Sequence, residues 1–173
     1  MNQQEINDRL SENHKSFVGF VTSLNEQQFE YSFDNKWTAG QQLDHIYRAL
    51  RPLTQGLALP KFLLRLIFPK SNRASITYES LVQKYTAKLA AGGKATRRFI
   101  PAPVSFNEKN ELCKKILKLV ARLSTQIDNF TEEELDIYIL PHPLLGKLTI
   151  REMMYFTIYH AAHHHEQTKR NLI

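Results

Sequence analysis

Four of the seven histidines lie close together near the end of the chain, at His160, His163, His164 and His165. On a helix that turns about 100° per residue, His160 and His164 lie roughly 40° apart, His163 lies at the margin of their face, and His165 points away. Two neutral imidazoles spaced i, i+4 can direct ring nitrogens at one divalent cation. The spacing therefore predicts two ligands of a metal site.

A third ligand must come from another helix, and His45, at the edge of an apolar stripe, is the best candidate. The alternative is that His160 and His164 are core-edge histidines that hydrogen-bond to backbone or water. His163 and His165 are expected to be solvated or to support the ligands from behind, rather than to bind the ion directly. His14 is expected to be a hydrogen-bonded histidine on a helix face, and His142 a loop residue.

These histidines must be positioned by long amphipathic helices. Apolar residues recur at helical spacing over 2–24, 38–56, 107–129 and 149–170, and a further helix is expected over 77–91. Capping boxes are predicted where Thr38 precedes Gln41 and where Thr149 precedes Glu152. No segment has a convincing strand pattern. We therefore predict an all-α four-helix bundle with an irregular, partly helical connection between its second and third long helices.

Composition limits the class of protein. A chain of 173 residues with 42% hydrophobic and 23% charged residues fits a single globular domain spanning 1–173. The only cysteine, Cys113, excludes an intramolecular disulfide and any zinc site built on two thiolates. The polar start of the chain lacks the features of a signal peptide, and the apolar stretch from Leu57 to Phe68 is too short to span a membrane. We expect a cytoplasmic protein.

Three segments resemble the signature of the DinB/YfiT-like superfamily: WTAGQQLDHI from Trp37, HPLLGKLT from His142 and HAAHHHEQ from His160. They occur in the family's order. The resemblance implies a four-helix bundle, often a homodimer, that carries a divalent metal, commonly zinc or nickel, on three histidines. It assigns the ligands to His45, His160 and His164. It also implies a packing role for Trp37 and a site-facing position for Gln167, which could hydrogen-bond to a ligand or to coordinated water.

Three neutral imidazoles leave coordination positions free, as in catalytic rather than structural metal sites. Such a metal can activate water for hydrolysis or bind a low-molecular-weight thiol as the thiolate. Glu152 and Glu166 both point away from the histidine face, so no general base is evident. We therefore favour a thiol S-transferase acting on a small-molecule electrophile, in keeping with activities known in the family. A metal-dependent hydrolase is the alternative, and Glu79 could supply its base.

A third possibility is a non-catalytic stress-response protein that binds metal or anions. The net charge of +6 permits anionic partners. Nucleic acid is disfavoured because no reading motif or aromatic platform accompanies the charge. The segment KFLLRLIF could mediate dimerisation or touch a membrane surface. The charge includes two basic clusters, which are Lys61, Arg65, Lys70 and Arg73, and then Lys94, Arg97 and Arg98.

Overall fold

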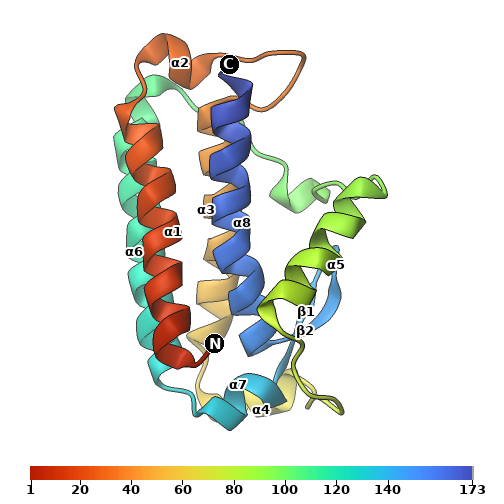
Figure 1. The fold of residues 1–173 in the computed structure, drawn as a ribbon. Helices are drawn as coiled ribbons and strands as arrows, with labels where there is room; N and C mark the ends of the chain where they lie inside the picture. The colour runs from red at the N-terminus through yellow and green to blue at the C-terminus, as the bar shows by residue number, and fades with distance from the viewer. Residues whose placement is uncertain (173) are drawn as a thin grey trace.

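Four long helices stand side by side in the computed structural model, which describes residues 1–172 (Figure 1). Helices α1 and α3 each pack against both α6 and α8, so the four form a bundle. The predicted all-α bundle is confirmed. The bundle helices are α1 (Gln3–Ser23), α3 (Ala39–Leu57), α6 (Lys109–Asp128) and α8 (Ile150–Asn171).

Local capping fixes where the two site-bearing helices begin. The Thr38 hydroxyl accepts a hydrogen bond from the Gln41 backbone, and the Gln41 side chain accepts one from the Thr38 backbone. Thr149 and Glu152 make the same reciprocal pair at the start of α8. Both pairs satisfy backbone donors that a helix leaves free at its first turn. The two predicted capping boxes are therefore confirmed, and they set which side chains face inward.

The connection between α3 and α6 is partly helical, as predicted. It contains α4 (Lys61–Ile67), α5 (Tyr78–Ala90) and two short 3-10 turns, η1 (Arg97–Phe99) and η2 (Phe106–Glu108). Helix α5 begins after Thr77 and is followed by Gly92 at φ +86°, a backbone conformation that favours glycine. Figure 1 shows α5 beside the lower half of α8, outside the four-helix bundle. Two more short helices, α2 (Glu26–Glu30) and α7 (Glu132–Ile137), join the bundle helices elsewhere.

A small β-hairpin precedes α8, so the expectation that no strand forms was wrong. Strands β1 (Ile139–His142) and β2 (Gly146–Thr149) pair antiparallel, with His142 opposite Gly146. Pro141 and Pro143 obscure the strand pattern, and four residues are too few to show clear alternation. Gly146 has φ +80° at the end of the turn, where a glycine closes the hairpin without strain.

The first basic cluster is largely tied into the fold. Lys61 and Arg65 both contact the carboxylate of Glu134, and Arg73 pairs with the buried carboxylate of Glu152. These cations stabilise the lower end of the bundle and are not free to gather an anionic partner. Within residues 1–172, no helix combines the length and the apolar character that crossing a membrane requires.

Candidate metal centre

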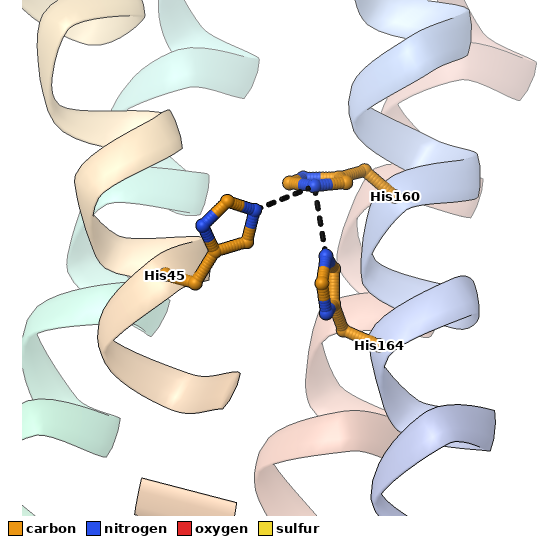
Figure 2. A group of neighbouring side chains, drawn as sticks. All are labelled: His45, His160 and His164. Atoms are coloured by element: carbon orange, nitrogen blue, oxygen red, sulfur yellow. Dashed lines mark hydrogen bonds between the residues drawn. The ribbon is translucent and has the colours of Figure 1, made fainter. Parts of the chain in front are cut away.

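Three buried histidines from two helices converge inside the bundle. His45 lies on α3, while His160 and His164 lie one turn apart on α8 and face it (Figure 2). The Nε2 atom of His160 lies 3.1 Å from Nε2 of His45 and 3.0 Å from Nε2 of His164. Their ligand atoms all lie within 4.8 Å of one another. The structure thus brings together the three histidines that the sequence singled out.

Hydrogen bonds on the far side of two of these rings fix their orientation. Nδ1 of His45 lies 2.7 Å from the Phe99 carbonyl oxygen, which can only accept. Nδ1 of His164 contacts the side-chain oxygen of Gln42, which is itself buried. In a neutral imidazole whose Nδ1 carries the proton, Nε2 holds a lone pair. Both rings therefore present lone pairs to the shared space.

This donor set fits a divalent cation. Because two of the three Nε2 atoms can only accept, the single proton that His160 could offer cannot satisfy both neighbours. A cation satisfies all three at once. Ligand nitrogens about 2.1 Å from one ion lie roughly 3.0 to 3.4 Å apart, which agrees with the closest nitrogen separations here. Acceptors on the outer nitrogens, as Phe99 and Gln42 provide, are typical of histidines that bind metals.

The electrostatic environment keeps the three rings neutral. Burial lowers the pKa of His160 well below its usual value, and the neighbouring rings of His164 and His45 add to the effect. Burial, followed by the proximity of His45 and His163, likewise lowers the pKa of His164. Burial also lowers the pKa of His45, against the opposing effect of the Phe99 hydrogen bond. Neutral imidazole is the form that binds a metal ion.

Aromatic side chains surround the centre. The Trp37 ring lies 5.0 Å from His45 and is stacked on His164 at 6.2 Å between ring centroids. On the other side, Phe156 is stacked on His160 at 4.7 Å. The predicted packing role of Trp37 is therefore exerted on the site itself. Apolar rings of this kind limit access of water to the histidines.

The three histidines lie in the wall of a cavity of about 910 Å³. The cavity follows α3 from Gln42 to Leu57, a length of roughly 22 Å at 1.5 Å per residue. Its lining is mostly apolar and includes Leu50 and Phe68. No aspartate or glutamate among residues 1–172 lines it, whereas four cationic side chains do. These are Lys36, Lys94, Arg98 and Arg170.

The other predicted residues have varied positions. Gln167 and His163 both line the cavity, although neither hydrogen-bonds to the three histidines among the described residues. His165 instead packs against Phe20 of α1, 5.1 Å between centroids, so it does not flank the site. Glu79 is exposed and lies outside the cavity lining, so it does not supply a base there.

His14 and Cys113 are buried. Nδ1 of His14 donates to the Leu10 carbonyl at 2.7 Å, as expected for a histidine on a helix face. Its Nε2 atom is buried without a partner among residues 1–172, and His14 also lines the cavity. Cys113 lies outside the cavity lining, and burial raises the pKa of its thiol.

Sequence reasoning missed three contributors to the cavity. Gln42 lies three residues before His45, so its position on the inner face of α3 could have been noticed. Phe99 acts through its backbone carbonyl, which carries no side-chain signal. His142, expected in a loop, instead ends strand β1, lines the cavity and has its ring centroid 4.2 Å from that of Phe156.

Comparisons with known proteins agree with this architecture. A family model, the DinB superfamily, matches residues 9–168, which include α3 and α6 entirely, most of α1 and α8, and the three converging histidines. No curated protein and no solved structure shows a significant match to this chain. A match over nearly the whole chain shows the family: the chain belongs to the DinB superfamily.

Proposed function

We propose that this protein is a divalent-metal-dependent enzyme whose ion is held by His45, His160 and His164. The observation that carries the proposal is the convergence of three Nε2 atoms in the wall of a large cavity. A structural zinc site is closed by four protein ligands, whereas three ligands beside a cavity leave room for a substrate. A cation held there would lower the pKa of a coordinated thiol or water. Zinc and nickel both suit imidazole ligands.

The cavity supports a small, elongated and anionic substrate. Its apolar walls along α3 favour a hydrocarbon or aromatic body. The cationic side chains Lys36, Lys94, Arg98 and Arg170 are exposed or partly exposed along the lining, with no carboxylate among residues 1–172 to offset them. Lys94 and Arg98 belong to the second basic cluster of the sequence. That cluster would attract an anion to the cavity rather than bind nucleic acid.

The same lining favours thiol transfer over hydrolysis. Hydrolysis by activated water commonly uses a carboxylate as general base, and the described lining has none. Thiol transfer requires less assistance because coordination itself favours the thiolate. The sulfur would form a bond to an electrophilic carbon, the leaving group would depart with its electron pair, and the thiol proton would pass to solvent. The co-substrate is then a low-molecular-weight thiol.

A metal-dependent hydrolase is the second candidate, and His163 favours it. Its ring lies 5.2 Å from that of His164 and lines the same cavity, so it could accept a proton from water near the ion. Burial, then the charge of Arg170, lowers the pKa of His163, which leaves the ring neutral and able to act as a base at pH 7. Replacing His163 should abolish a hydrolase reaction and leave thiol transfer largely unchanged.

The test is a turnover screen with untagged protein loaded with zinc or nickel. Low-molecular-weight thiols are paired with electrophiles carrying a carboxylate or a neutral group, and esters and amides are screened in parallel. Three proteins are compared: wild type, His160→Ala and His165→Ala. The last removes a histidine of the same helix that lies outside the cavity lining.

Metal-dependent thiol consumption by wild type and His165→Ala, but not by His160→Ala, would support the S-transferase. Ester or amide cleavage with the same pattern would support the hydrolase instead. Metal binding without turnover of either kind would favour the non-catalytic alternative. The homodimer and the cytoplasmic location stay predictions, and light scattering of the purified protein tests the first.

A further inference from the structure

His142 is a polar group in the cavity wall that the metal site does not use. It ends strand β1, and its ring lies edge-on to Phe156 at 4.2 Å between centroids. Phe156 is in turn stacked on His160. The ring of His142 is therefore one aromatic side chain away from a proposed metal ligand, and it faces the same cavity.

The turn of the hairpin fixes which nitrogen of His142 carries the proton. Nδ1 lies 3.2 Å from the backbone nitrogen of Leu144 and 3.0 Å from that of Leu145. Backbone N–H groups can only donate, so Nδ1 accepts from both. A neutral imidazole that accepts at Nδ1 carries its hydrogen at Nε2. Burial, together with the nearby charge of Lys84, lowers the pKa of His142 to about 4, so the ring is neutral at pH 7.

The Nε2–H group has no acceptor among residues 1–172. No described side chain or carbonyl hydrogen-bonds to it, and the Nε2 atom is not fully buried. The atom is therefore accessible to solvent, and it belongs to a residue that lines the cavity. The hairpin thus holds a neutral hydrogen-bond donor, with its direction set by two backbone bonds, in the wall of the proposed substrate cavity.

We propose that His142 binds the substrate by donating its Nε2–H to a carbonyl or carboxylate oxygen. The proposal rests on the proposed function only in taking this cavity as the substrate site. It narrows the substrate class to molecules that carry an oxygen acceptor beside an apolar body. The donor is fixed before binding, so the bond forms without the cost of orienting the side chain.

Two substitutions of His142 distinguish the donor at Nε2 from the acceptor at Nδ1 that holds the turn. Asparagine at position 142 can keep an oxygen where Nδ1 accepts from Leu144 and Leu145, but it cannot reach the position of Nε2. Glutamine can place an amide N–H near the position of Nε2, but it loses the acceptor for the turn. His142→Asn therefore removes the donor and retains the turn, whereas His142→Gln does the reverse.

The probes are acetophenone and ethylbenzene, which share a ring and differ chiefly in the carbonyl group. Both are neutral, so the cationic side chains of the cavity do not bias the comparison. Binding is followed by nuclear magnetic resonance of the ¹⁵N-labelled protein as purified, and again after chelation. In wild type we expect His142 to be the Nε2–H form and its Nε2 signal to shift on addition of acetophenone.

We expect His142→Asn to weaken acetophenone binding about five- to tenfold, the effect of one hydrogen bond, and to change ethylbenzene binding less than twofold. His142→Gln should bind acetophenone within about threefold of wild type. Equal acetophenone affinity in wild type and His142→Asn would overturn the proposal, as would an Nδ1–H form or an Nε2 signal that acetophenone does not shift.

Amide signals of 139–149 show whether His142→Asn keeps the hairpin. If it does not, the wild-type tautomer and the acetophenone shift decide the matter, since both are measured without a variant. Because the measurement is repeated after chelation, its result is independent of metal binding. A positive result in a protein that binds no metal would retain the role of His142 and reject the proposed metal-dependent enzyme.

Discussion

Helix α8 contributes buried polar side chains to two clusters about two turns apart, and the two clusters differ in how these side chains are satisfied. The carboxylate cluster, at the start of the helix, consists of Glu152 with Arg73 and of Arg151 with Asp136. Glu152 is 0% exposed, yet its oxygens accept from Arg73, from the Ile76 backbone at 2.8 Å and from the Thr149 backbone at 2.9 Å. Both carboxylate oxygens of Glu152 are therefore satisfied within the fold.

The histidine cluster, made of His45, His160 and His164, is satisfied only on its outer side. The oxygens of Phe99 and Gln42 accept hydrogen bonds from Nδ1 of His45 and His164. The three Nε2 atoms face one another beside a cavity. A buried polar group that lacks a partner costs stability. Burial and perturbed pKa values alone therefore do not mark a functional site. The distinguishing feature is a set of nitrogen lone pairs that the neighbouring groups do not satisfy and that lie beside space for a ligand.

We expect the largest loss of stability from a substitution that breaks the carboxylate cluster. Glu152→Ala leaves the backbone N–H groups of Ile76 and Thr149 without their acceptor and removes the capping box of α8, so we expect the free energy of unfolding to fall by about 2 to 4 kcal/mol. Urea unfolding followed by circular dichroism measures this. Glu166→Ala, on the exposed face of the same helix, is the matched control and should leave the midpoint unchanged. Equal midpoints for both variants would show that the carboxylate cluster is not structural.

Acid should affect the two regions at different pH values. Burial lowers the pKa of His14, which lines the histidine cavity, to about 4, so below pH 6.5 the unfolded chain binds a proton that the folded protein does not. Stability is therefore lost as the pH falls from about 6.5 to 4, by about 3 kcal/mol for this residue. His14→Gln should lessen the pH dependence of the urea midpoint over that range by this amount, while the other buried histidines keep theirs. An unchanged slope would contradict the assigned burial of a neutral ring.

The carboxylate cluster should respond at lower pH. Burial alone would raise the pKa of Glu152, but the hydrogen bond from Arg73 and the two backbone donors reverse this and lower it. A depressed folded-state pKa means that stability is present above about pH 4.5 and is lost as the pH falls further. Glu152→Gln should therefore reduce the pH dependence of stability below about 4.5 and leave the window from 6.5 to 4.5 intact, while Glu132, Glu134 and Asp136, whose pKa values are also lowered, keep the remainder.

Added metal should stabilise only through the histidine cluster. At a free zinc concentration about 100 times its Kd, we expect the free energy of unfolding to rise by about 2.7 kcal/mol in wild type. The Tm of Glu152→Ala should rise with zinc in a similar way despite its lower starting value. His160→Ala should show no rise. A zinc-dependent rise in His160→Ala would mean that the ion binds elsewhere.

The smallest expected effect concerns the hydrogen bond between His164 and Gln42, which orients the His164 ring. Gln42→Ala removes the acceptor that orients His164, and we expect metal affinity to fall about 10- to 100-fold. Gln167→Ala is the matched control, because Gln167 lines the cavity without a hydrogen bond to the three histidines. It should change affinity by less than about threefold. Competition with a chelating dye measures both, and equal losses would reject the role of Gln42.

Much of this arrangement could be predicted because its signals are local. The two capping boxes and the helical period of apolar residues define α3 and α8, and the i, i+4 spacing of His160 and His164 follows directly. The support of the site could not be predicted in the same way. The Phe99 carbonyl accepts a hydrogen bond from His45, which lies 54 positions earlier in the sequence. The position of Phe99 depends on how the segment between α3 and α6 packs, and no local pattern predicts that packing. The hairpin that places His142 in the cavity wall could not be predicted, because Pro141 and Pro143 obscure the strand pattern in the sequence.

The most direct test of the central claim is elemental analysis of untagged protein purified without added metal or chelator. Four proteins are compared: wild type, His45→Ala, His160→Ala and His165→Ala. We predict near-stoichiometric zinc, nickel or another divalent metal in wild type and His165→Ala, and loss of that metal in the other two. A wild type that contains no metal and takes up neither zinc nor nickel would contradict the claim, as would a metal content that His45→Ala and His160→Ala leave unchanged.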